Sequence, residues 1–366
     1  MRIGVLSSSR ADYGIYRPLL KKLSNDSSFD LSIIAFGMHL LPKHGNTISE
    51  IEKDAFGEIF KVNGMPEGDS KQDIVSGYGD IVKAFGEFWQ QNCFDWVLVL
   101  GDRWEVSAAV QASIPFEIKL AHIHGGETTL GATDNIYRHQ ISLASTLHFT
   151  AAETFSERVS ALIESNADVY TVGSISLEGL AQMLLPSWQE VKQQFYIPFD
   201  KFILVTFHPE SVNADENQNL ATITYDSLSA LAEEQALLIT KANADVMGNL
   251  FNEKLAALAK EKPSRVKLVA SLGKLNYFSA MQHCEFLLGN TSSGIIEAAS
   301  FKKWVLNVGN RQKGRLQSGN VLDVPFKTAS IIESAKKLND FNSFTGDNKY
   351  VTENTSDRIL EELLKL

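Results

Sequence analysis

The sequence predicts an α/β protein built from two doubly wound parallel sheets. Short continuous apolar runs, typical of buried parallel strands, alternate with helical patterns. The alternation stops once, in a stretch that holds two prolines and no strand pattern, and then restarts. We therefore expect a first unit over residues 1–173, a connector over 174–200, a second unit over 201–345, and a C-terminal helix over 346–366 that packs back on the first unit.

The predicted elements follow the apolar patterns along the chain. Strands are expected at residues 3–6, 31–36, 96–100, 119–123, 147–150 and 169–172, and then at 202–207, 236–240, 266–270, 286–288 and 305–308. Helices are expected at 73–88 and 105–113, and after the first loop, where Tyr16, Leu19, Leu20 and Leu23 recur at helical spacing. Pro18 fits the first turn of that helix.

Composition limits the class of protein. The chain has 366 residues, of which 44% are hydrophobic and 21% charged, as in globular proteins. Its net charge of -10 argues against a nucleic-acid-binding surface, and its two distant cysteines suggest reduced thiols. The apolar run at 3–6 is too short for a signal peptide, and no run approaches the ~20 apolar residues of a membrane span. We expect a soluble cytoplasmic protein without nucleic-acid or membrane partners.

Ionisable residues gather in residues 120–151, between a strand and the helix that follows it. The strand breaks at Gly125-Gly126, where glycine leaves the backbone free, and a helix begins near Asp134, a favoured place for a carboxylate. In an open α/β sheet ligands bind at such a turn, so we expect a functional site here. The ionisable residues of the stretch are His122, His124, Glu127, Asp134, Arg138 and His139.

Structural alternatives exist for parts of this stretch. Asp134 and Arg138 stand one helical turn apart and could form an ordinary exposed pair. His122 and His124 alternate on the strand and would share a face, either as core histidines with satisfied nitrogens or as a metal pair. A metal is the less favoured choice, because no cysteine or third strong ligand follows at ligand spacing.

Two further loops in the first unit carry charge. Asp102 and Arg103 end a buried strand, where charge is costly unless it is used or compensated, and we favour a functional role. Near the N-terminus, Arg10 and the amides of the first helix could hold an anion. A plain helix cap by a serine or by Asp12 is the equal alternative.

The second unit has loops suited to phosphate. Residues 288–294 form a small polar loop that leads from a strand into a helix, although Ser292 or Ser293 could merely cap that helix. Residues 309–315, which include Arg311, add three cations in a glycine-bounded loop. Neither loop is a GxxxxGK[ST] or GxGxxG motif. Since both end strands of one sheet, they should meet at one edge and favour a nucleotide diphosphate.

The chain resembles the UDP-N-acetylglucosamine 2-epimerases, and within them the hydrolysing branch of nonulosonic (sialic-type) acid synthesis. The matching motifs stand in family order along nearly the whole chain. They are SRADYG at 9–14, GDR at 101–103, HIHGGE at 122–127, DNIYRH at 134–139, FHP at 207–209, GNTSSGIIE at 289–297 and GNRQKGR at 309–315.

The resemblance implies two Rossmann-like domains of the GT-B type with the sugar nucleotide in the cleft between them. The residues that it would place on the diphosphate are Arg10, His208, Ser292, Ser293 and Arg311, with Glu297 as the ribose clamp and Asn243 near the nucleotide. Those that it would place at the sugar are Asp102, Arg103, Glu127 and Asp134. We add Asp12, Thr291, Arg138 and His139 to the expected substrate contacts and His124 to the catalytic candidates.

The implied reaction removes the C2 proton, expels UDP to give a glycal, adds water at C1 and returns a proton at C2 from the other face. Neither a cofactor such as NAD nor a metal is implied.

The chain departs from the family at one place. Many members have His-x-Glu-Gly where this chain has His124 in the glutamate position, and the nearest acid is Glu127. The assignment of acid and base is therefore open. We expect Asp102 to serve elimination, Glu127 and Asp134 to serve hydration, and His124 to be neutral and supportive.

Other readings remain at this point. The same reaction could act on UDP- or GDP-N,N'-diacetylbacillosamine in legionaminic acid synthesis, and the enzyme could be a non-hydrolysing epimerase. A GT-B glycosyltransferase or a sugar-nucleotide sensor would not need the acids Asp102, Glu127 and Asp134. A homodimer or homotetramer is expected.

Overall fold

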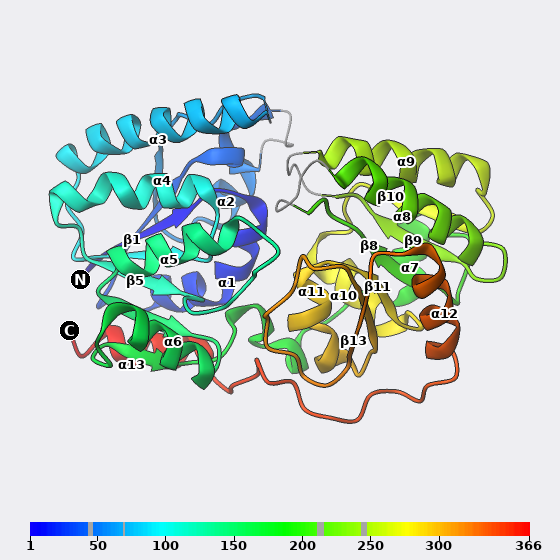
Figure 1. Ribbon diagram of the computed structural model, residues 1–366. Coiled ribbons are helices and arrows are strands. Elements are labelled where there is room, and N and C mark those ends of the chain that lie inside the picture. The colour runs from blue at the N-terminus through cyan, green and yellow to red at the C-terminus, as the bar shows by residue number, and fades with distance from the viewer. Residues whose placement is uncertain (43–46, 69, 211–215, 243–246) are drawn as a thin grey trace. The chain divides into compact units, whose positions relative to one another are not determined.

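The computed structural model describes residues 1–42, 47–68, 70–210, 216–242 and 247–366 (Figure 1). The chain forms two compact units. The first consists of Met1–Glu127, Asp134–Leu180 and Tyr350–Leu366, and the second of Thr128–Thr133 and Ala181–Lys349.

The described residues of the first unit form a seven-stranded parallel sheet. The strand order has the doubly wound pattern, in which the chain first builds one half of the sheet and then returns to build the other. In spatial order the strands are β3 (Glu58–Lys61), β2 (Asp30–Ala35), β1 (Arg2–Ser7), β4 (Trp96–Leu100), β5 (Leu120–Ile123), β6 (Leu147–Thr150) and β7 (Val169–Thr171).

Helices bury both faces of this sheet, which explains why its strands read as continuous apolar runs. One face packs against α1 (Arg10–Asn25), α2 (Ile48–Asp54) and α13 (Thr355–Leu363). The other packs against α3 (Lys71–Gln91), α4 (Trp104–Ser113) and α5 (Asp134–Ala144), which lie side by side in Figure 1. A further helix, α6 (Glu153–Ile163), packs on β6 and β7.

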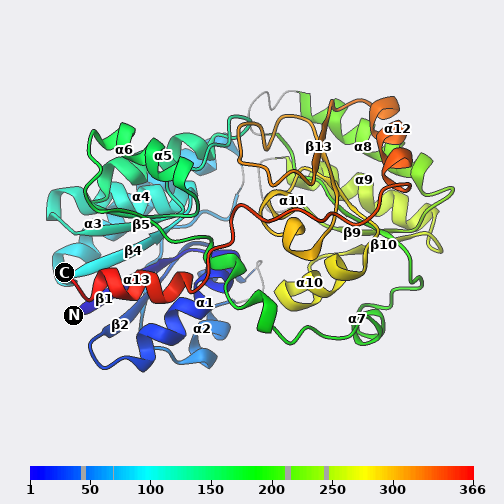
Figure 2. The same cartoon turned by 90° about the horizontal axis from the view of Figure 1, so that it is seen from below.

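The last helix of the chain belongs to the first unit. In Figure 2, α13 lies alongside α1. Its apolar face buries Ile359 and Leu363 completely in the core beneath the sheet. Glu178 ties it further, because that carboxylate accepts hydrogen bonds from Ser356 and from Lys22 on α1.

The second unit repeats the same winding in a six-stranded parallel sheet of the described residues. In spatial order the strands are β10 (Val266–Val269), β9 (Leu237–Thr240), β8 (Ile203–Thr206), β11 (Leu287–Gly289), β12 (Val305–Val308) and β13 (Val321–Val324). One face packs against α8 (Asn217–Leu231), α9 (Gly248–Glu261) and α12 (Thr328–Leu338). The other packs against α7 (Trp188–Phe195) and α10 (Gly273–His283), while the short α11 (Ser292–Ile296) follows β11.

The predicted doubly wound sheets are confirmed, and two strands were missed. Both β3 and β13 are edge strands, and their side chains are only partly buried, so neither gives a continuous apolar run.

The prediction for Pro18 was wrong. The helix begins at Arg10, which places Pro18 in its interior, where buried packing by residues such as Leu19 and Leu20 outweighs the lost hydrogen bond.

Among the described residues, no helix combines the length and the apolar character that a membrane span requires.

Two glycines of the first unit allow a test of how tightly the loop after β5 is packed. Gly126 and Gly179 both have left-handed backbones, with φ of +76° and +68°. A Cβ at Gly126 would overlap the backbone carbonyl of Phe155, whereas a Cβ at Gly179 would meet open space. We expect Gly179→Ala to cost about 1 kcal/mol from backbone strain. Gly126→Ala should cost about 1–3 kcal/mol more, because it also overpacks the loop. Urea unfolding of both variants measures this difference, and equal losses would contradict the packing.

Candidate functional site

Each sheet has a topological switch point, where the strand order reverses and where open α/β sheets bind ligands. In the first unit it lies between β1 and β4, and in the second between β8 and β11. Residues singled out in the sequence follow each of these strands within a few positions. Among them are Asp12 after β1, Asp102 after β4, His208 after β8 and Thr291 after β11.

A buried arginine joins two of the predicted acids in the first unit. Arg138, on α5, is only 2% exposed. Its Nη2 pairs with Asp102 Oδ2, and its Nη1 donates to the backbone oxygen of Glu127 over 2.7 Å. A buried guanidinium is costly unless charge and hydrogen bonds compensate it. Arg138 is therefore not the exposed helix residue that its spacing from Asp134 suggested, and it fixes Asp102 and Glu127 relative to one another.

The loop after β5 carries a histidine–glutamate pair. His124 Nδ1 lies 2.7 Å from Glu127 Oε1, and both residues are buried. His124 follows the end of β5 and has a left-handed φ of +66°, which is uncommon for a residue with a Cβ. The prediction that His122 and His124 share a strand face was therefore wrong.

His122 is a core histidine. Its Nε2 donates to the Gly101 carbonyl over 2.8 Å, and its Nδ1 lies 2.9 Å from Ser142 Oγ. Burial lowers the pKa of His122 to about 3, so the ring is neutral and Nδ1 accepts the serine hydrogen. Because protein groups engage both nitrogens, His122 fits the structural alternative and not a metal pair.

The switch point of the first unit holds an acid that the sequence did not single out. Glu105, on α4, is completely buried, and its Oε1 pairs with Arg103 and accepts a 3.1 Å hydrogen bond from Ser8 Oγ. Its apolar neighbours hid it among helix residues in the sequence, although a charged residue within an otherwise buried helix is itself a signal. Arg103 thus forms an ion pair with Glu105, while Asp102 pairs with Arg138.

Asp12 takes the capping role that the sequence left open. Its carboxylate accepts hydrogen bonds from Ser7, Ser8 and the Ser9 amide, and Ser9 caps the helix that begins at Arg10. Burial alone would raise the pKa of Asp12. The nearby His39, whose Nε2 lies 3.9 Å from Asp12 Oδ1, and the serine donors outweigh burial and lower that pKa. A buried carboxylate with these partners has a structural role of its own.

Asp134 and His139 lie on α5 with Arg138. Asp134 opens the helix, as predicted, and is partly buried. His139 Nε2 lies 3.3 Å from Asn135 Nδ2, and burial lowers the pKa of this histidine. The structure thus gathers Asp102, Glu127 and Arg138 closely and puts Asp134 and His139 on the same helix as Arg138.

In the second unit the switch point is built on an asparagine. Asn290, just beyond β11, is completely buried, and its side chain forms two hydrogen bonds with the backbone of His208 beyond β8. The His208 amide donates to Asn290 Oδ1 over 2.7 Å, and Asn290 Nδ2 donates to the His208 carbonyl over 2.8 Å. The side chain imitates a peptide group and so continues the pairing of the two strands past their ends. Asn290 stands in a motif used for the resemblance, but no local pattern around it indicates this supporting role.

The same residue gathers the two loops predicted to hold phosphate. The backbone oxygen of Asn290 accepts from Gln312 Nε2 over 2.9 Å and from Arg311 Nη1 over 3.2 Å. The loops after β11 and β12 therefore meet at one edge, as the sequence predicted. Glu210 supports the second loop, because its Oε1 accepts from the Asn310 amide over 2.7 Å.

The small polar loop enters α11 with a cap that differs from the predicted one. Thr291, not Ser292 or Ser293, is the N-cap, and its hydroxyl accepts from the Ser293 amide. Both serines stand in the first turn of the helix and are partly exposed, and Glu297 follows its end.

Arg10 is exposed at the start of α1 in the first unit. Asn243 lies outside the described residues.

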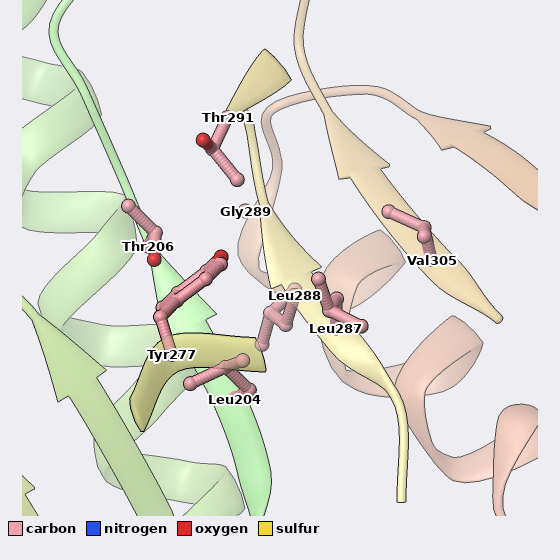
Figure 3. A pocket seen from close by; sticks show the side chains of 8 residues that line it. All are labelled: Leu204, Thr206, Tyr277, Leu287, Leu288, Gly289, Thr291 and Val305. Atoms are coloured by element: carbon pink, nitrogen blue, oxygen red, sulfur yellow. The ribbon is translucent and has the colours of Figure 1, made fainter. Parts of the chain in front are cut away.

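A narrow pocket with no room for a water molecule lies under the loop after β11. Figure 3 shows Tyr277 and Thr206 on one side of it and Thr291 above β11. Burial raises the pKa of Tyr277 to about 12, so its hydroxyl keeps its proton. Because this pocket admits no water molecule, it cannot hold a ligand in this form.

Comparison with known proteins places these features in one family. The family model for UDP-N-acetylglucosamine 2-epimerase matches residues 21–364. The polysialic acid biosynthesis protein P7 of Escherichia coli is 31% identical over all of this chain and 94% of its own length. The GDP/UDP-N,N'-diacetylbacillosamine 2-epimerase (hydrolyzing) of Campylobacter jejuni is 34% identical over 88% of this chain and 84% of its own.

The fold agrees with this assignment. The structure of UDP-GlcNAc 2-epimerase from Neisseria meningitidis bound to UDP-GlcNAc matches with a TM-score of 0.81 at 18% identity, covering 100% of both chains. The two parallel-sheet units are thus of the GT-B type that the sequence resemblance implied. On the family match and the relatives above 30% identity, the chain belongs to the UDP-N-acetylglucosamine 2-epimerase family.

Proposed function

We propose that this protein is a hydrolysing UDP-N-acetylglucosamine 2-epimerase, which converts UDP-GlcNAc and water into N-acetylmannosamine and UDP for nonulosonic acid and surface polysaccharide synthesis. The observation that carries the proposal is the attachment of Asp102 and Glu127 to the same buried Arg138 at the carboxyl edge of the first sheet. Arg138 pairs with the carboxylate of Asp102 and holds Glu127 by its backbone oxygen, so one guanidinium anchors two acidic residues. A reaction that removes one proton and returns another requires such a pair.

The reaction has two half-reactions. In elimination, the C2–H bond breaks, its electron pair forms the C1=C2 double bond, and the C1–O bond breaks with its pair leaving on UDP. In hydration, the electron pair of the double bond takes a proton at C2 from the opposite face, a water oxygen bonds to C1, and that water gives up one proton. The sum consumes one water and inverts C2.

In the first unit, Asp102 is the proposed base of elimination. It ends a buried strand and is held by Arg138, so its position is rigid. Glu127 and Asp134 are the proposed groups of hydration, since Glu127 lies beyond the Gly125-Gly126 turn and Asp134 opens α5. Separate groups for the two steps allow each to keep the protonation state that its step needs.

In the second unit, His208, Ser292, Ser293 and Arg311 are the proposed diphosphate contacts, with Glu297 on the ribose. Arg311 supplies a fixed positive charge, because a guanidinium does not lose its proton. Asn290 brings His208 and Arg311 to the same edge. Donors arranged in this way stabilise the charge that develops on the departing diphosphate.

A nucleotide-linked N,N'-diacetylbacillosamine is a second candidate substrate for the same reaction. The Campylobacter jejuni relative, at 34% identity, carries the name of a hydrolysing 2-epimerase of GDP/UDP-N,N'-diacetylbacillosamine. The same two half-reactions on that sugar would serve legionaminic acid synthesis. For either substrate we propose a homodimer or homotetramer in the cytoplasm.

A panel of nucleotide sugars tests the function directly. The protein should release UDP and free N-acetylmannosamine from UDP-GlcNAc, as measured by anion-exchange chromatography and proton NMR. Faster release from UDP- or GDP-N,N'-diacetylbacillosamine would select the second substrate. A retained UDP-linked epimer would mean a non-hydrolysing enzyme, and absence of nucleotide release with every sugar would refute the proposal.

The division of roles predicts different products from different variants. Asp102→Asn should lose elimination and release no UDP. Glu127→Gln and Asp134→Asn should still release UDP but accumulate the glycal, whose vinylic proton NMR detects. Glu157→Gln on the exposed side of α6 is the matched control and should behave as wild type. A glycal from neither hydration variant would show that these roles are wrongly assigned.

The phosphate loops predict a loss of nucleotide affinity. Arg311→Ala and Ser292→Ala should each weaken UDP binding by about 1–3 kcal/mol, because each removes a hydrogen bond to a charged group. Isothermal calorimetry with UDP measures the change, and Arg265→Ala, at an exposed arginine of the same unit, is the control. Wild-type affinity in both loop variants would exclude the proposed cradle.

A further inference from the structure

We propose that His124 is a positioning residue, which holds the Glu127 carboxylate for the hydration half-reaction and is itself held by Ser174. The inference rests on the proposed function, and it assigns a role to a buried histidine that contacts one of the proposed hydration groups.

The contact between the two side chains defines the direction of the hydrogen bond. His124 Nδ1 lies 2.7 Å from Glu127 Oε1, and the two residues are 9% and 2% exposed. A carboxylate oxygen can only accept, so Nδ1 carries the hydrogen. This short, buried bond orients the carboxylate of Glu127.

The opposite nitrogen of His124 meets a second anchor. Its Nε2 lies 3.4 Å from Ser174 Oγ, and that hydroxyl lies 2.9 Å from Ser176 Oγ. The backbone of Ser174 is fixed in turn, because its amide donates to the Tyr350 carbonyl over 3.0 Å. The imidazole is thus held between Glu127 and a buried serine pair from a distant part of the first unit.

The backbone of His124 has a conformation that favours this arrangement. Its φ of +66° is left-handed, and its amide donates to the Phe149 carbonyl at the end of β6 over 2.9 Å. A Cβ disfavours this region, and such outliers concentrate at functional sites. The turn directs the side chain of His124 back toward the loop that bears Glu127.

Glu127 needs two tethers because of where it stands. It follows Gly125-Gly126, and the φ of Gly126 is +76°, so the local sequence does little to fix the glutamate. Arg138 holds its backbone oxygen and His124 holds its carboxylate. Proton transfer depends steeply on geometry, so loss of the second tether should impair hydration while elimination at Asp102 continues.

The test separates the side chain of His124 from its backbone strain. His124→Gly removes the imidazole but accepts the left-handed turn, and His124→Asn keeps an amide donor in a residue that tolerates this conformation. Glu164→Gly, at an exposed left-handed residue that ends α6, is the matched control for the glycine. Each variant is assayed with the sugar nucleotide that wild type turns over, for UDP release, KM and the ratio of glycal to free sugar.

We expect His124→Gly to raise the glycal fraction at least about tenfold, with UDP release and KM within about threefold of wild type. His124→Asn should recover part of the loss, and Glu164→Gly should match wild type. The double variant His124→Gly/Glu127→Gln should hydrate no more slowly than Glu127→Gln, because the two residues act as one unit. If the glycine variant fails to fold, Ser174→Ala, which leaves the loop backbone intact, should shift the product ratio in the same direction.

A wild-type product ratio in the soluble His124→Gly or Ser174→Ala protein would overturn the inference while leaving the function intact. Equal slowing of UDP release and hydration, or a loss that adds to that of Glu127→Gln, would also overturn it. A wild-type protein that releases no nucleotide would instead refute the proposed function.

Discussion

The buried guanidinium of Arg138 is the constraint on which the site of the first unit depends. Removing a charge from water is expensive, so the fold must supply both a counter-charge and hydrogen-bond acceptors wherever such a group is buried. Asp102 provides the charge from the end of β4, and Glu127 provides a carbonyl from the loop after β5. One side chain on α5 thus ties together the loops that follow two paired strands, β4 and β5. A reaction that uses both Asp102 and Glu127 therefore takes place between loops that Arg138 restrains.

In the second unit, an uncharged side chain satisfies the buried polar groups at the strand ends. Two parallel strands, β8 and β11, stop pairing where the loops begin, which would leave buried amides and carbonyls without partners. Asn290 satisfies the His208 backbone through both ends of its amide, and its own carbonyl receives Arg311 and Gln312. One completely buried residue therefore sets the position of a histidine and an arginine from loops that are about a hundred residues apart in the sequence.

The sequence was sufficient for the architecture because parallel strands buried on both faces leave continuous apolar runs. It missed β3 and β13, since an edge strand needs no such run, and it placed Pro18 in the first turn because it located the helix start too late. For the site, the sequence located the loops but not the pairing within them. Helical spacing allowed an exposed pair of Arg138 with Asp134, whereas the structure buries Arg138 and pairs it with Asp102, in the loop after β4, a contact that only the tertiary fold creates.

Residues that were not predicted from the sequence also owe their roles to tertiary contacts and not to a local pattern. Glu105 and Asn290 bind no predicted ligand, and their importance lies in what they hold: Arg103 and Ser8 in one unit, His208 and Arg311 in the other. Such supporting contacts carry no local pattern, because each depends on tertiary packing. The left-handed turn at His124 is a further case, since nothing in the letters HIHGGE distinguishes a strand residue from one that begins the loop.

The central claim is that the first unit removes the C2 proton and later returns another from solvent. Conversion of UDP-GlcNAc in D2O tests it most directly, with mass spectrometry of the free sugar and, as a control, N-acetylmannosamine incubated with the protein alone. The account predicts one deuterium at C2 of the N-acetylmannosamine formed and none in the control. Epimer formed without deuterium would contradict the elimination and hydration route.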